Sequence, residues 1–164
     1  MLEEKTLNEI SLLAVKVCDV MTKQVIAVDS DETVKKAVDL MNEREIGCIL
    51  VLTRSKVDGI VTERDILKRV IGDKKDAETV KIREIMSRPI WTIEPDADLE
   101  TALKHMLRLK IKKLPVVTKG TLVGLLTLTD IAHFQPALLK KFKKLLTGEQ
   151  IPVRMQRVIQ CYIC

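Results

Sequence analysis

The apolar and polar positions along the chain predict one series of elements that occurs twice. A short alternating segment begins at Val25, and an amphipathic helix follows the start signal Ser30-Asp31. Next come an apolar strand at 48–52 and a turn around 54–58. A second strand at 59–61 follows and leads into a helix that begins at Thr62. The order is β-α-β-β-α. The amphipathic helix has apolar residues at the i, i+3, i+4 and i+7 spacing that buries one face: Val34, Ala37, Val38 and Met41.

The second series is a copy of the first, displaced by 65 residues along the chain. Residues 17–66 align with residues 82–131 without a gap, and the apolar positions keep their register. Identical pairs are more numerous than average composition gives by chance, so a duplication is predicted. These pairs are Met21/Met86, Asp31/Asp96, Ala37/Ala102, Met41/Met106, Ile46/Ile111, Val51/Val116, Thr53/Thr118, Gly59/Gly124, Thr62/Thr127, Asp65/Asp130 and Ile66/Ile131.

The duplication sets the predicted fold class and domain organisation. A unit of about 60 residues buries too little apolar surface to be comfortable alone, so the two copies should pack together about a pseudo-twofold axis. We predict an α/β (α+β) fold with tandem β-α-β-β-α repeats at 16–72 and 82–135, joined by a polar linker at 73–81. An N-terminal helix at 1–15 and a basic C-terminal helix and tail at 136–164 flank the repeats.

Composition and charge narrow the function classes. The chain is 46% hydrophobic and 31% charged, which suits a buried core and excludes a disordered chain. Its apolar runs are too short to span a membrane, and its first residues lack a signal-peptide pattern, so a cytoplasmic location is expected. The net charge of +5 resides in 132–164, which is either a solvated helix face or a contact surface for an acidic partner, an anionic membrane or nucleic acid.

The repeated Thr-x-x-Asp motif follows an apolar strand at 59–65 and again at 124–130. One interpretation is a capping box, in which Thr caps a helix and the acid reaches back. The other is a nucleotide site: a helix start offers free N–H groups to phosphate, and a carboxylate in the first turn can accept ribose hydroxyls. These parts suit a nucleotide better than catalysis.

The duplicated pattern resembles a tandem pair of CBS domains, a Bateman module, of the stand-alone type. The residues that carry the resemblance are 20–28, the Ile-Lys-Lys-Leu-Pro-Val-Val segment at 111–117, and the two Gly-apolar-apolar-Thr-x-x-Asp segments at 59–65 and 124–130. The resemblance covers about residues 16–135.

The resemblance implies that the protein binds adenosine derivatives in two clefts between the repeats: AMP, ADP, ATP or S-adenosylmethionine. In each cleft, Thr-x-x-Asp of one repeat would hold ribose and phosphate, and strands of the other repeat would enclose the adenine. One predicted site comprises Thr22, Val25, Ile26, Gly47, Cys48, Thr127, Thr129 and Asp130. The other comprises Thr62, Arg64, Asp65, Ser87, Ile90, Trp91, Lys112, Lys113 and Leu114.

Departures from repeat symmetry predict that the two clefts are not equivalent. The first repeat lacks the basic pair Lys112-Lys113, which the resemblance assigns to phosphate. Trp91 stands where the first repeat has Ile26, and it either stacks on adenine or fills the pocket. Arg64 either contacts phosphate or pairs with a neighbouring acid. Cys48 is expected to be buried near a pocket.

We therefore predict a regulatory module that is not an enzyme, has no cofactor beyond its nucleotide ligand, forms a homodimer and acts on an unidentified protein by a conformational shift. The alternatives are a dimerisation scaffold that binds no nucleotide and a regulator that binds nucleic acid through the basic C-terminal helix. His105 and His133 are expected at surface or packing positions. Cys161 and Cys164 are half of a zinc site, which two chains together could complete with four thiolates, or a redox pair, or thiols of a tail that binds no metal.

Overall fold

The computed structural model describes residues 15–139 of the chain. The described residues include only residue 15 of the predicted helix at 1–15 and only the first part of the predicted basic helix and tail at 136–164. They do not include the Cys161/Cys164 pair. The described residues form two compact units. The Asp65 unit comprises 24–91 and 119–122, and the Asp130 unit comprises 15–23, 92–118 and 123–139.

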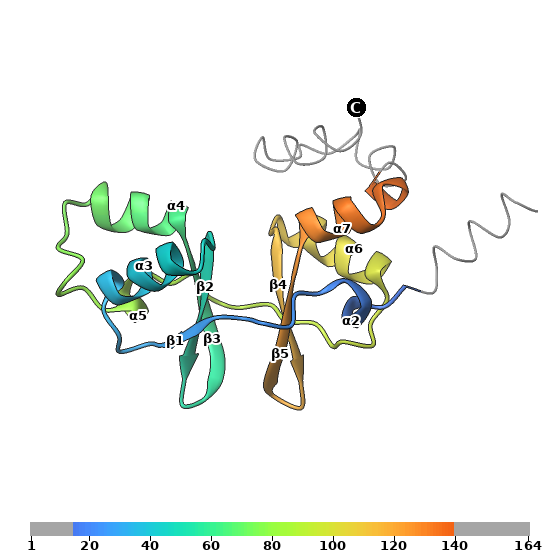
Figure 1. The fold of residues 1–164 in the computed structure, drawn as a ribbon, viewed down its shortest axis with the longest axis horizontal. Helices are drawn as coiled ribbons and strands as arrows, with labels where there is room; N and C mark the ends of the chain where they lie inside the picture. The colour runs from blue at the N-terminus through green and yellow to red at the C-terminus, as the bar shows by residue number, and fades with distance from the viewer. Residues whose placement is uncertain (1–14, 140–164) are drawn as a thin grey trace, which may run out of the picture. The chain divides into compact units, whose positions relative to one another are not determined.

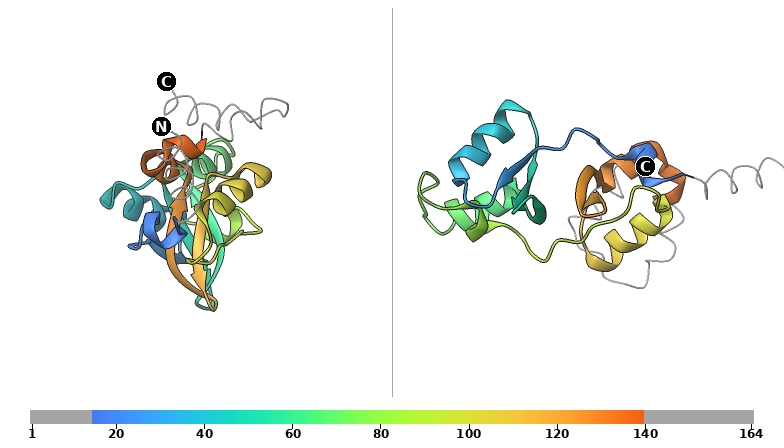
Figure 2. Two further views of the ribbon diagram at one scale, coloured as in Figure 1. Left: turned by 90° about the vertical axis from the view of Figure 1, so that its right-hand side faces the viewer. Right: turned by 90° about the horizontal axis from the view of Figure 1, so that it is seen from below.

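The Asp65 unit contains a three-stranded sheet with the order β1-β2-β3. Strand β1 runs parallel to β2, with Ala27 opposite Leu50, and β2 runs antiparallel to β3, with Cys48 opposite Thr62. Figures 1 and 2 show that the helices of this unit cover one face of its sheet. Its elements are β1 (Ala27–Asp29), α3 (Val34–Glu43), β2 (Cys48–Thr53), β3 (Lys56–Thr62), α4 (Glu63–Ile66), the π-helix η1 (Leu67–Ile71) and α5 (Ile82–Ile85).

The Asp130 unit repeats this plan with one strand fewer. Its sheet pairs only β4 with β5. The predicted first strand of the second repeat is reduced to one parallel bridge between Ile93 and Val116, so that part of the prediction is wrong. Pro89 and Pro95 flank the bridge, and proline supplies no backbone donor to a ladder. The elements are α2 (Val17–Val20), α6 (Leu99–Leu109), β4 (Lys113–Thr118), β5 (Thr121–Thr127) and α7 (Leu128–Phe134).

The turn between β2 and β3 is shorter than the sequence predicts. Only Arg54 and Ser55 separate the strands, and both have positive φ, 51° and 63°. Two residues with positive φ form the turn that matches the twist of a hairpin. The predicted turn around 54–58 was therefore too long, because neither residue is the glycine or asparagine that normally signals this conformation.

Two one-turn helices, α2 and α5, were not predicted, and each packs on the unit of the other repeat. Within the Asp130 unit, the backbone N–H of Val17 donates to the carbonyl of Ala97 (2.9 Å). Within the Asp65 unit, the N–H of Ile82 donates to the carbonyl of Glu32 (2.9 Å). The leading segment of each repeat thus belongs to the other compact unit. Sequence repeats and compact units do not coincide.

An ion pair at the start of α2 joins the leading segment of the first repeat to the rest of the Asp130 unit. The Lys16 ammonium lies 2.7 Å from Asp98 at the start of α6, although both side chains are about half exposed. The hydrogen bond to Asp98 is the main cause that raises the pKa of Lys16, and desolvation opposes it. Because the pair is so exposed, its contribution to stability is small.

Each unit has its own hydrophobic core. The predicted face of α3 is confirmed by buried Val34, Ala37 and Met41, whereas Val38 is partly buried. The equivalent face of α6 packs into the core of the Asp130 unit with Leu99, Ala102, Leu103 and Met106. The helical period in the sequence thus corresponds to the faces that the units bury.

Helix α3 begins later than its sequence signal suggests, and its cap gives a stability prediction. Thr33 is the N-cap, and its hydroxyl accepts a hydrogen bond from the N–H of Lys36 (3.3 Å). Replacing Thr33 with alanine should lower the free energy of unfolding by about 1 kcal/mol, because this donor loses its protein acceptor. Urea denaturation measures the change. Thr101→Ala, at an exposed position inside α6, is the control and should be neutral or slightly stabilising.

Candidate ligand-binding site

Both Thr-x-x-Asp motifs form complete capping boxes. Asp65 Oδ2 accepts from the N–H (2.9 Å) and the hydroxyl (2.6 Å) of Thr62, and the Thr62 hydroxyl accepts from the N–H of Asp65 (3.3 Å). Asp130 Oδ2 accepts from the N–H (2.8 Å) and the hydroxyl (2.7 Å) of Thr127 in the same way. The cap therefore uses one carboxylate oxygen and leaves Oδ1 for other partners.

In each unit a crossing segment, 86–87 in one and 21–22 in the other, pairs with the strand before the motif and brings a hydroxyl residue beside it. In the Asp65 unit, Ser87 exchanges backbone hydrogen bonds with Ile60 of β3 (2.9 and 3.3 Å). Its hydroxyl donates to Asp65 Oδ1 (3.0 Å). The predicted grouping of Ser87 with Asp65 is thus present within one unit. A Cβ at Gly59 would lie 2.6 Å from the sulfur of Met86, so only glycine lets the segment approach this closely.

The Asp130 unit contains the same crossing with different side chains. Thr22 and Leu125 of β5 exchange backbone hydrogen bonds of 2.9 Å in both directions. Gly124 makes room for the crossing, because a Cβ there would lie 2.4 Å from the sulfur of Met21 and 3.1 Å from the carbonyl oxygen of Thr22. Thr22 therefore lies beside the strand that leads into Thr127.

A surface hollow of about 410 Å³ lies beside the second motif. Its volume is within the range of about 300–1,000 Å³ that is common for small-molecule sites. It combines carboxylates, a hydroxyl, an imidazole and an aromatic ring. The residues that line it, all within the Asp130 unit, are Asp19, Val20, Thr129, Asp130, His133 and Phe134.

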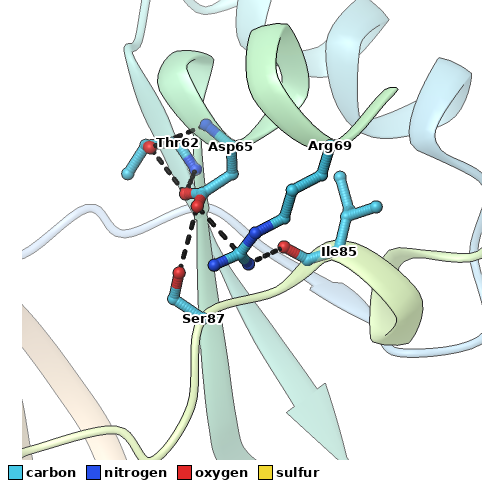
Figure 3. A network of polar contacts seen from close by, with 5 residues as sticks. All are labelled: Thr62, Asp65, Arg69, Ile85 and Ser87. Carbon is cyan, nitrogen blue, oxygen red and sulfur yellow. Dashed lines mark hydrogen bonds and ion pairs between the residues drawn. The ribbon is translucent and has the colours of Figure 1, made fainter. Parts of the chain in front are cut away.

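In the first motif Asp65 contacts an arginine, whereas in the second motif Asp130 lines the hollow. Arg69 of η1 donates through Nη1 to the carbonyl oxygen of Ile85, and the same nitrogen lies 3.4 Å from Asp65 Oδ1. Figure 3 shows the guanidinium between the helix and the crossing segment, next to the Ser87 hydroxyl on the same side of the Asp65 carboxylate. The side chain of Asp65 is only 15% exposed.

Comparison with known proteins identifies this duplicated arrangement. The CBS domain family matches residues 17–72 and 82–137. The chain belongs to the CBS-domain family. A CBS domain-containing protein of Bacillus subtilis, YhcV, is 34% identical over 114 residues, which cover 70% of this chain and 81% of YhcV.

Solved structures share the fold of this CBS pair. A putative signal-transduction protein with CBS domains from Burkholderia ambifaria is 25% identical with a TM-score of 0.66, covering 85% of this chain and 99% of that one. The CBS domain pair of protein MJ0100, solved with 5′-methylthioadenosine and S-adenosylmethionine, is 26% identical with a TM-score of 0.67. That match covers 76% of this chain and 98% of the other.

The remaining predicted ligand residues of this CBS pair differ in accessibility. Trp91 is 50% exposed, whereas the side chain of Leu114 is buried in the core of the Asp130 unit. Cys48 is partly buried, whereas the sequence predicted a buried side chain. Arg64 is exposed, and no ion pair joins it to Glu63 in the described part of the chain. The other predicted residues are half-buried or exposed: Val25, Ile26, Gly47, Ile90, Lys112 and Lys113.

Sequence reasoning missed Arg69, Asp19, Val20 and Phe134 in this CBS pair. The repeat offset was a usable signal, since it aligns Arg69 with Phe134 and Ile85 with Val20. Among residues 15–139, no cluster of three or more metal-ligating side chains occurs. The same range contains no helix with the length and apolar character needed to cross a membrane.

Proposed function

We propose that this CBS pair is a regulatory module, without a catalytic role, that binds an adenine nucleotide such as AMP, ADP or ATP. The observation that carries the proposal is the position of Asp130, which lines a hollow of about 410 Å³ at the end of β5. The adenosine ligands of the related MJ0100 pair support the class of ligand.

The chemistry of the hollow fits a nucleoside. A carboxylate can accept both hydroxyls of a ribose, and the cap of α7 occupies Oδ2 of Asp130 through Thr127. The exposed Thr129 hydroxyl supplies a donor for phosphate or ribose oxygen, and Phe134, 54% exposed, offers an apolar ring for a base.

The proposed signal is a shift between conformations. A ligand that also contacts the other repeat, as the family resemblance implies, favours one arrangement of the repeats by as much as its affinity for the two arrangements differs. The partner that reads this shift is an unidentified protein, and we propose a homodimer as the working assembly.

A second candidate function is an interaction scaffold independent of nucleotide. The observation in its favour is an exposed apolar pair on η1, where Leu67 is 63% and Ile71 is 64% exposed. Residues four apart lie on one helix face, so the two side chains can share one apolar patch, and contiguous exposed apolar patches mark contact surfaces. The nucleic-acid alternative depends on the basic segment 136–164, nearly all of it outside the described residues.

A thermal-shift series with AMP, ADP, ATP, GTP and S-adenosylmethionine tests the proposed function. A ligand present at 100 times its dissociation constant stabilises the native state by about 2.7 kcal/mol. The melting temperature should therefore rise by several degrees with at least one adenosine compound. GTP is the matched control, since it has the same ribose and phosphates with another base. No shift with any adenosine compound at millimolar concentration would favour the scaffold function.

A further inference from the structure

Both oxygens of the Asp65 carboxylate already contact groups of the protein itself. A carboxylate has about four lone-pair positions. Thr62 occupies both positions on Oδ2 through its N–H and its hydroxyl. On Oδ1, the Ser87 hydroxyl donates from 3.0 Å, and Nη1 of Arg69 lies 3.4 Å away. A ribose hydroxyl that binds Asp65 Oδ1 must therefore compete with Ser87 and Arg69 for the same oxygen.

Two contacts hold the side chain of Arg69 beside Asp65. It lies one helical turn after Asp65, and its Nη1 also donates to the carbonyl oxygen of Ile85. Figure 3 shows that Arg69 and Ser87 approach Asp65 from two different segments, η1 and the crossing segment. The side chain of Arg69 is 38% exposed, so ligand can reach the pair and compete with it.

The second repeat lacks this occupant. Phe134 aligns with Arg69 and cannot donate to a carboxylate. Phe134 and Asp130 instead both line the hollow described above. The same motif thus contacts an arginine in one unit and lines a hollow in the other.

We propose that Arg69 is an internal competitor for the ribose-binding carboxylate of the first repeat, so that the Asp130 site binds nucleosides more tightly than the Asp65 site. This inference rests on the proposed function and adds that one residue sets the difference between the sites. Arg69 acts here as an autoinhibitory contact, and its removal exposes an acceptor that the fold already positions.

Isothermal titration with AMP, which carries a free ribose, measures the effect at each site separately. In the Asp130→Ala background, AMP binding reports the Asp65 site alone. Adding Arg69→Phe, which copies the second repeat, should tighten this binding about tenfold, since Asp65 Oδ1 loses a charged competitor. In the Asp65→Ala background, Phe134→Arg should weaken the Asp130 site by a similar factor. Opposite changes at the two sites are not expected from a merely structural role.

Three controls keep the test decisive. The melting temperature of each unliganded variant shows that it is folded, and Arg69→Met replaces Arg69→Phe if the latter is not. Adenosine is titrated beside AMP: if removing Arg69 weakens AMP but not adenosine, Arg69 binds phosphate and the proposal is overturned. Equal affinities at the two sites, unchanged by either substitution, overturn it while leaving the proposed function intact. No binding of AMP or S-adenosylmethionine by the unmodified chain or by Arg69→Phe overturns both.

Discussion

Replacing Asp130 with alanine is expected to lower the affinity for an adenine nucleotide by about a hundredfold. Two ribose hydroxyls would lose a charged acceptor, and each hydrogen bond to a charged group contributes about 1.5–3 kcal/mol. Loss of about 2.7 kcal/mol already corresponds to a hundredfold change. Titration calorimetry with AMP measures the dissociation constant.

The matched control for this substitution is Asp65→Ala. Asp65 and Asp130 cap their helices with the same geometry, so both substitutions remove the same type of cap. Each substitution should cost about 1 kcal/mol for the lost cap, and Asp65→Ala should cost more in total, because Ser87 and Arg69 also lose their acceptor. Only Asp130→Ala should abolish the tighter nucleotide site, because Arg69 and Ser87 already occupy Asp65. If both variants bind AMP as the unmodified chain does, the ligand site lies elsewhere.

Truncating Leu103 to alanine is expected to produce the largest loss of stability, about 2–5 kcal/mol. Leu103 lies on α6 with no exposed surface, inside the core of the Asp130 unit. The substitution removes buried apolar atoms and leaves a cavity that the neighbouring side chains fill only partly. Because domains are stable by only about 5–15 kcal/mol, the urea midpoint should fall clearly.

Leu67→Ala provides the control for Leu103→Ala, since it removes the same atoms from an exposed site. Leu67 is 63% exposed on η1, so its truncation should change the free energy of unfolding by less than about 0.5 kcal/mol. Equal losses from the two substitutions would mean that α6 does not bury the face described here.

The duplication and the helix faces could be predicted because they depend on spacing along the chain. The period of Val34, Ala37 and Met41 is enough to indicate which side of α3 is buried, because residues at this spacing share one helix face. The identical pairs at an offset of 65 residues likewise indicated the duplication, and the CBS family matches both copies.

Other features could not be predicted from the sequence, because their signals are short or depend on the neighbouring residues. Helices α2 and α5 have four residues each, too few to show a helical period. The first strand of the second repeat was predicted as a copy of the alternating segment in the first repeat, but the prolines around Ile93 leave one bridge there.

The sequence by itself determined the Thr-x-x-Asp caps, because Thr62 and Asp65 meet through a three-residue spacing that any helix start brings together. The i, i+4 spacing likewise brings Arg69 beside Asp65, whereas only the tertiary structure decided that Ser87 and the carbonyl of Ile85 lie there too. Arg69 reaches a carbonyl 16 residues away, and Ser87 reaches Asp65 across 22 residues. Such contacts arise when α5 and the crossing segment pack onto β3, a placement set by burial of the core and by the space at Gly59. No local spacing encodes them.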